Sequence, residues 1–154
     1  MHKVFAFMML TSLFCSCDEN FEPTDGKIML YSVVDNTGVV FAVENGMAQV
    51  VHIDNFYGSW IPSRTIDGED WHITTEEELL KINDRKERLN KVINSAGGDK
   101  ISEEIYWINK TAGSSEAERY HLGHGCKWYS AFTSSSNNTR YVREVPVVDA
   151  TTGE

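Results

Sequence analysis

The chain has 154 residues, of which 41% are hydrophobic and 24% charged, so it can form one domain with a buried core but not two. Its formal net charge is −9, from 23 acidic and 14 basic side chains. A nucleic acid would repel so acidic a chain, and an anionic bilayer would not attract it through a basic face.

The first sixteen residues have the three parts of a secretory signal. Lys3 lies in a short positive region, an apolar stretch of about eleven residues covers 4–14, and small residues precede Cys17. This stretch is too short to span a bilayer as a helix, which takes ~20 residues. We expect residues 1–16 to be removed, and loss of Lys3 then takes the net charge from −9 to −10.

The end of this signal reads Leu13-Phe14-Cys15-Ser16-Cys17 and resembles the lipobox of bacterial lipoproteins. The resemblance implies that Cys17 becomes the first residue and carries acyl chains such as palmitate, each contributing about 0.8 kcal/mol per buried methylene. A plain secreted protein cut nearby is the alternative. Cys126 then has no partner within the chain, which excludes a disulfide framework.

An acidic segment, Asp18 to Asn20, follows the cysteine and resembles the surface-export signal of lipoproteins from Bacteroides-type bacteria. It implies an outer-membrane location with exposure at the cell surface; a merely polar tether is the alternative. We expect a lipidated tether over 17–26, one domain over 27–146 and a flexible tail over 147–154.

The first elements of the domain are predicted to be strands. Residues 27–34 alternate as a strand does, and turn-forming residues follow at 35–38. Asn45-Gly46 then separates two β-rich runs, 39–44 and 47–53, which predicts a hairpin with a type I′ turn because both central residues need positive φ.

One helix is predicted over about 75–95, after an irregular segment at 54–70. Thr75 and Glu78 form a capping box, Thr74 and Glu77 offer the same motif one residue earlier, and the glycines at 97 and 98 end the helix. Its apolar residues recur at helical spacing: Leu79, Ile82, Leu89, Val92 and Ile93.

The last third is predicted to contain three short strands, at 105–108, 127–132 and 140–145, separated by polar loops. The element order therefore favours an α+β domain dominated by antiparallel sheet, with one main helix. Trp71 and Trp107 are expected in its core.

Several segments resemble those of the C-terminal domain of the Legionella collagen-like protein and of the Fibrobacter major paralogous domain. These are Gly68 to Leu79, Tyr106 to Thr111 and Tyr141 to Val145, within roughly residues 27 to 146. Thr74 replaces the proline of that pattern, and Ile108 to Lys110 replaces its serines. The resemblance implies a C-type-lectin-like fold and ligand binding or adhesion at a cell surface, by analogy of fold.

The cluster His121, His124 and Cys126 offers two imidazoles and a thiol within six residues, so these residues are weak candidates for a metal site. His52 or His72 would have to complete the ligand set. A thiol nucleophile with a histidine base and a small buried cysteine are the alternatives. The spacing matches no specific zinc signature, so we expect no metal, no cofactor and no catalytic residue.

The aromatic residues near the polar loops are the candidates for ligand binding, because exposed rings suit protein or glycan contacts. The candidate binding residues are Tyr120, His121, His124, Trp128 and Tyr129. Trp128 and Tyr129 point to opposite faces if they lie in a strand, so one at most faces outward. The sequence thus predicts a non-catalytic binding or adhesion module anchored in the bilayer at Cys17, with loops between 111 and 139 carrying recognition. The alternative is a structural accessory subunit of an envelope or pilus assembly.

Overall fold

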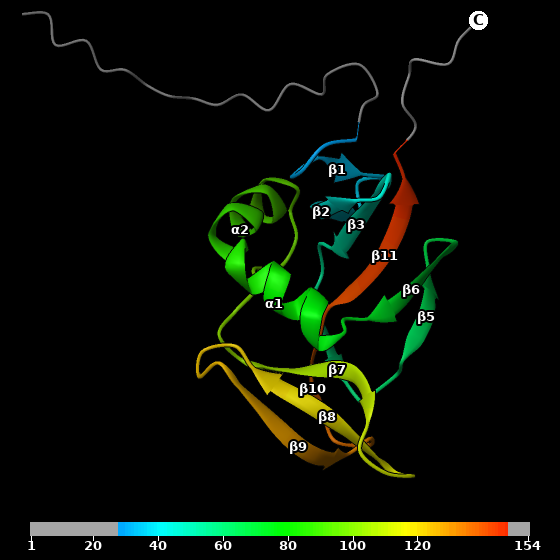
Figure 1. Ribbon diagram of the computed structural model, residues 1–154, viewed down its shortest axis with the longest axis vertical. Helices are drawn as coiled ribbons and strands as arrows, with labels where there is room; N and C mark the ends of the chain where they lie inside the picture. The colour runs from blue at the N-terminus through cyan, green and yellow to red at the C-terminus, as the bar shows by residue number, and fades with distance from the viewer. Residues whose placement is uncertain (1–27, 148–154) are drawn as a thin grey trace, which may run out of the picture.

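The computed structural model describes residues 28–147 (Figure 1). The predicted signal peptide, the lipidation site Cys17, the tether and residues 148–154 of the predicted tail lie outside this range. The described chain forms eleven strands in a six-stranded and a five-stranded sheet, together with two short helices. The prediction of an α+β domain with one main helix is therefore wrong, because the described chain is mostly β-sheet.

The six-stranded sheet is built around the predicted hairpin, which is confirmed. Asn45 and Gly46 both have positive φ, of 52° and 75°, and join the second strand to the third. The sheet runs in the order β1 (Val33–Val34), β2 (Gly38–Glu44), β3 (Met47–His52), β11 (Tyr141–Pro146), β6 (Glu69–Ile73) and β5 (Ser63–Ile66).

Two predictions for this sheet are corrected. The strand expected over 27–34 is reduced to β1, because Tyr31 has a φ of 69° and the chain turns before Val33. The segment expected to be irregular, 54–70, contains most of a second tight hairpin. Asp67 and Gly68 have φ of 52° and 85° and join β5 to β6, as Asn45 and Gly46 do for β2 and β3.

The predicted helix is divided into α1 (Glu76–Asp84) and α2 (Lys86–Ser95). Its capping box is confirmed: Thr75 Oγ1 accepts a hydrogen bond from the Glu78 N–H, and the Thr75 N–H donates to the Glu78 carboxylate. At the break, the Lys81 carbonyl accepts from the Arg85 guanidinium, while the Arg85 N–H bonds to Ile82. Within the described range no helix has the length and apolar character needed to cross a bilayer.

The five-stranded sheet contains strands that the sequence pattern did not indicate. Its order is β4 (Phe56–Gly58), β10 (Asn137–Thr139), β7 (Ile105–Thr111), β8 (Glu116–His121) and β9 (Cys126–Phe132). β10 pairs antiparallel with β4 and parallel with β7. The polar segments expected to be loops at 111–117 and 134–139 thus contain the start of β8 and all of β10, because strand pairing satisfies their backbone groups.

The core lies between the two sheets and under the helices. The buried residues of the helices are Leu79, Ile82, Leu89 and Ile93, and all four are fully buried as the helical spacing predicted; Val92 packs against them. Trp71 and Trp107 are 1% and 0% exposed, which confirms their predicted place in the core.

A buried arginine joins the two sheets. Arg140 is fully buried between β10 and β11, and its guanidinium donates to the backbone carbonyls of Ile53 and Asp99 at 3.0 and 2.6 Å. Burial lowers the pKa of this side chain. The arginine holds the segment after β3 and the segment after α2 against the junction of the sheets.

The two ends of the described chain leave the domain at the same end of the molecule (Figure 1). The Val147 N–H donates a hydrogen bond of 2.8 Å to the carbonyl of Gly46, which fixes the C-terminal exit beside the β2–β3 turn. The five-stranded sheet lies at the opposite end of the molecule. We call the first end the tether end and the five-stranded sheet the distal sheet.

Candidate binding surface

The predicted binding residues lie on the β8–β9 hairpin of the distal sheet, and Tyr120 does not fit its predicted role. Its ring is 7% exposed and belongs to the cluster that packs under the helices, so it is a core residue rather than a contact residue. Trp128 and Tyr129 belong to β9. The positions of their side chains lie outside the part of the chain that the structure describes.

The histidines His121 and His124 lie together where β8 turns into β9. Their rings stack with centroids 4.0 Å apart, and the His124 N–H donates to His121 Nδ1 at 3.2 Å. Cys126 is the cross-strand partner of His121. The turn between them contains Gly125 with a φ of 59°, which a glycine adopts without strain.

This hairpin brings together the three residues that the sequence singled out as weak metal candidates. Across residues 28–147, however, no group of three or more histidine, cysteine or acidic side chains is arranged to hold a metal ion. His52 lies on β3, and His72 on β6 pairs with Glu78 at 3.2 Å, so both belong to the other sheet.

His52 has a core role of its own. Its ring lies 5.1 Å from that of Phe56 and 4.9 Å from that of Trp71, in edge contacts with both. The Asp54 N–H donates to its Nδ1, and burial lowers the pKa of the imidazole, which favours the neutral form.

Three exposed apolar side chains, which the sequence pattern did not single out, belong to the two edge strands of the distal sheet or to the connection that follows β4. Tyr57 is 72% exposed, Phe132 62% and Ile61 39%. Tyr57 comes from β4, Ile61 from the connection to β5, and Phe132 from the end of β9. We call these three residues the distal patch.

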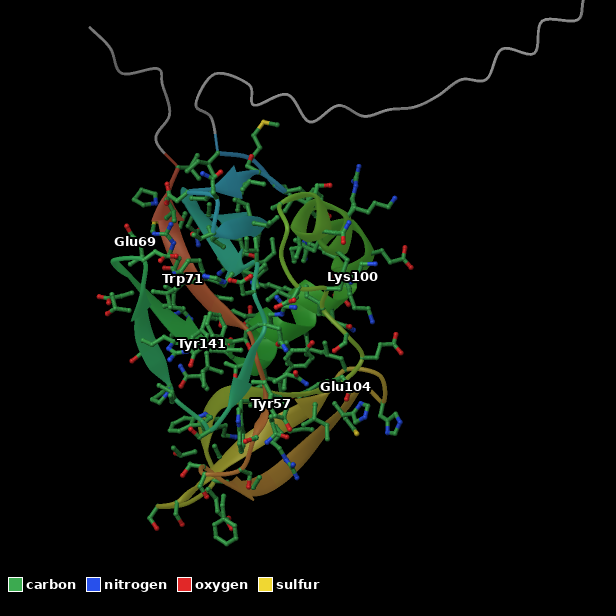
Figure 2. All side chains as sticks on the ribbon, turned by 180° about the vertical axis from the view of Figure 1, so that it is seen from behind. Tyr57, Glu69, Trp71, Lys100, Glu104 and Tyr141 are labelled. Carbon is green, nitrogen blue, oxygen red and sulfur yellow. The ribbon has the colours of Figure 1, made fainter. Side chains whose placement is uncertain are left out.

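One backbone hydrogen bond brings these segments together. The Trp60 N–H donates to the carbonyl of Thr133 at 2.8 Å, so the residues flanking Trp60 and Thr133 lie side by side. In Figure 2, Tyr57 lies over the distal sheet, whereas Glu69 and Trp71 lie nearer the chain ends. Tyr57 therefore lies on the part of the molecule away from the tether end, as does β9, which carries Phe132 (Figure 1).

Two indole hydrogen bonds hold the segment that carries Tyr57 and Ile61 in place. Trp107 Nε1 donates to the carbonyl of Gly58, and Trp60 Nε1 donates to that of Ile108, each at 3.0 Å. These bonds tie the segment that carries Tyr57 and Ile61 to β7. The patch is thus built on fixed backbone rather than on an untethered loop.

Ion pairs link the three long strands of the distal sheet to the first helix. Glu118 on β8 pairs with Lys127 on β9 at 2.8 Å and with Lys110 on β7 at 3.2 Å, and Lys127 also pairs with Glu76 at 2.9 Å. Burial alone would raise the pKa of Glu118, but the two lysines bring it below its usual value. The pairing with Glu118 and Glu76 raises the pKa of Lys127.

The predicted recognition role of the loops between 111 and 139 stays a prediction. Of that segment, Phe132 is the residue that joins the distal patch, and the other two members come from the region expected to be irregular. The sequence signal that could have pointed to these exposed residues is a pair of aromatic residues, Tyr57 and Trp60, beside turn-forming residues.

No known protein family matches the sequence, and the search of curated proteins finds no match. The resemblance to the Legionella and Fibrobacter domains stays a prediction.

Proposed function

We propose that this chain is a lipid-anchored, non-catalytic binding module, held in the outer membrane at Cys17 and presenting the distal patch to a ligand outside the cell. The observation that supports this most is the position of Tyr57 and Phe132. Both rings are more than half exposed, and their strands, β4 and β9, belong to the distal sheet, which lies at the end of the molecule opposite to the one where the chain enters and leaves (Figure 1). A domain anchored through its N-terminal segment would hold these rings away from the bilayer.

The chemistry of the distal patch favours a protein ligand. It combines a phenol ring, a phenyl ring and a branched aliphatic side chain, and aromatic side chains dominate the energetics of protein interfaces. Sugar rings also stack on aromatic faces, but they need polar partners around them, whereas Phe132 and Ile61 offer none. A protein surface with its own apolar residues fits the patch better.

The fixed backbone under the distal patch supports a binding role. Side chains that protrude from an ordered scaffold lose less conformational freedom on binding than side chains on a mobile loop. The hydrogen bonds of Trp60 and Trp107 provide that scaffold for two of the three patch residues.

Site-specific crosslinking in intact cells tests this proposal. A photoreactive phenylalanine analogue is placed at Tyr57 or Phe132, with Leu80 on α1 as the matched control because it is also exposed and apolar. We expect one and the same protein to be crosslinked from both patch positions but not from Leu80, and purified wild-type chain to compete for it. A glycan array run with the same chain tests the sugar alternative.

The outcomes separate the possible roles. Saturable crosslinking to a protein outside the cell supports the binding module, and crosslinking to a stoichiometric envelope component favours the accessory subunit. Equal crosslinking from Leu80, or glycan binding that survives loss of both rings, contradicts a protein-binding patch.

A further inference from the structure

The tether end carries its own group of exposed apolar side chains. Met29, Leu30, Val33 and Val43 are 46%, 37%, 44% and 43% exposed. Val33 pairs with Val39 at the start of β2. The segment before it runs beside the same strand, because the Tyr31 N–H donates to the carbonyl of Val40 at 2.8 Å. Met29 and Leu30 lie in the turn that precedes β1, where the Ser32 N–H donates to the carbonyl of Met29 at 2.9 Å.

A basic helix surface borders this apolar group. A surface depression beside Tyr31 is lined by four cations from the α1–α2 junction and α2, namely Arg85, Lys86, Arg88 and Lys91. The Arg88 guanidinium lies 5.2 Å from the centre of the Tyr31 ring, which joins the basic surface to the segment carrying Met29 and Leu30.

The acidic residues of this depression do not cancel its charge. Asp84, Glu87 and Glu103 also line it, and Glu103 pairs with Lys86 at 2.9 Å. Four cations thus face three carboxylates, so the lining carries a formal charge of +1 on a chain whose net charge is −9.

We infer that the tether-end surface, made of Met29, Leu30, Val33 and Val43 with Arg88 and Lys91, rests on an anionic lipid bilayer. Apolar side chains bordered by lysine and arginine suit the boundary between acyl chains and anionic headgroups. This inference rests on the proposed anchor at Cys17, and it adds the orientation in which the anchored domain sits.

The length of the connection permits this contact. Cys17 lies eleven residues before Ile28, the first described residue, and an extended chain reaches at most about 3.6 Å per residue. The domain therefore stays within roughly 40 Å of its anchor. This short connection keeps the domain surface at a high effective concentration near the bilayer, so weak contacts can form. Contact at the tether end would direct the distal patch outward.

Photoreactive lipids test the orientation. The full lipidated chain is reconstituted into phosphatidylcholine vesicles with phosphatidylglycerol, a small part of which carries a photoreactive headgroup, and the crosslinked peptides are identified by mass spectrometry. We expect crosslinks at 28–33 and 86–91 to exceed those at Tyr57 and Phe132 at least tenfold. Omitting phosphatidylglycerol should lower the α2 crosslinks several-fold.

Variants that add negative charge to the tether-end surface test its role, and Leu80→Asp is the control. Arg88→Glu with Lys91→Glu, or Val33→Asp with Val43→Asp, should remove most tether-end crosslinks, whereas Leu80→Asp should not. Equal crosslinking at both ends of a chain that stays with the vesicles overturns this orientation and leaves the anchor intact. A chain that does not stay with the vesicles overturns both the anchor and the orientation.

Discussion

The Trp60 N–H donates a hydrogen bond of 2.8 Å to the carbonyl of Thr133, and this contact joins two segments that are far apart in the sequence. It places the connection after β4 beside the end of β9. As a result, Ile61 and Phe132, which flank the two hydrogen-bonded residues, are brought close together, although β4 and β9 stand at opposite ends of the strand order of the distal sheet. The distal patch is therefore a product of the tertiary structure and not of any local sequence motif.

Removing the rings of the distal patch should weaken ligand binding without unfolding the domain. The double variant Tyr57→Ser, Phe132→Ser loses two exposed rings, and interface anchors of this kind contribute about 2 kcal/mol or more each. We expect at least a tenfold rise in Kd for the crosslinked partner and a change in Tm of no more than a degree or two. Leu80→Ser is the matched control, and an equal loss of binding in that variant contradicts the assignment.

The glycine at position 98 should be intolerant of a side chain. A Cβ there would lie 2.6 Å from both the Cβ and the carbonyl oxygen of Ile53, so the backbone would have to shift. We expect Gly98→Ala to lower the free energy of unfolding by about 1–3 kcal/mol. Gly113→Ala adds a Cβ with nothing within 4 Å and is the control. Urea denaturation of the two variants checks this, and equal stability would show that the close approach is absent.

Replacing the indole of Trp107 by a phenyl ring should loosen β4. In Trp107→Phe the part-buried carbonyl of Gly58 loses its donor and the smaller ring leaves space in the core, which together cost about 1–3 kcal/mol. We expect a loss of stability in that range and faster amide exchange over Phe56–Gly58. Phe132→Leu, which changes an exposed ring, should alter stability by only a few tenths of a kcal/mol. Unchanged exchange in β4 would remove this indole from the support of the distal patch.

The pair formed by His72 and Glu78 should stabilise the fold over a limited range of pH. Hydrogen bonding to Glu78 raises the pKa of His72 above 6.5. The His72 contribution is therefore fully present below pH 6.5 and is lost as the pH rises through the folded-state pKa. Burial opposes the charge of Glu78, but His72 and Thr75 together lower the pKa of its carboxyl below 4.5. The Glu78 contribution is thus present above pH 4.5 and is lost as the pH falls below that value.

Wild type should therefore exceed His72→Gln in stability most clearly between pH 4.5 and 6.5. Because His72 is about a third exposed, the difference should be no more than about 1 kcal/mol. Denaturation of both proteins at several pH values measures it. A difference that grows above pH 7 would contradict the pairing.

The contribution of His52 to the stability of the fold should depend on pH in the opposite direction to that of His72. Burial lowers its pKa below 6.5, so the neutral ring contributes stability that is complete above pH 6.5 and declines as the pH falls toward the folded-state pKa. The pH dependence of the wild type combines both histidines, so the comparison with His72→Gln isolates the pair. Direct titration of the two imidazole resonances by NMR should give a higher pKa for His72 than for His52.

Local signals of the sequence predicted some elements well. Asn45-Gly46 fixed the first hairpin because positive φ at both positions allows few alternatives, and the Thr75–Glu78 capping box located the start of α1. The signal of Asp67-Gly68 was equally good, but the exposed residues around it obscured the alternation of β5 and β6. The single predicted helix failed at Arg85, where Asn83 and Asp84 are weak helix formers and the arginine side chain caps a carbonyl.

The elements and surfaces that the sequence did not predict depend on contacts between segments that are distant in the chain. β8 has four polar side chains in six residues, so nothing local distinguishes it from a loop, and its strand character comes from pairing with β7 and β9. The same pairing buried Tyr120, which a local interpretation placed on the surface. The distal patch and the basic surface beside Tyr31 likewise require the tertiary structure to be recognised.

The intact mass of the mature chain purified from its native membranes tests the lipid anchor itself. We predict that the first residue is Cys17, that it carries more than one fatty acyl chain, and that a Cys17→Ser variant leaves the membrane fraction. A soluble mature chain without acyl mass on its first residue would contradict the anchor, and with it the outward presentation of the distal patch.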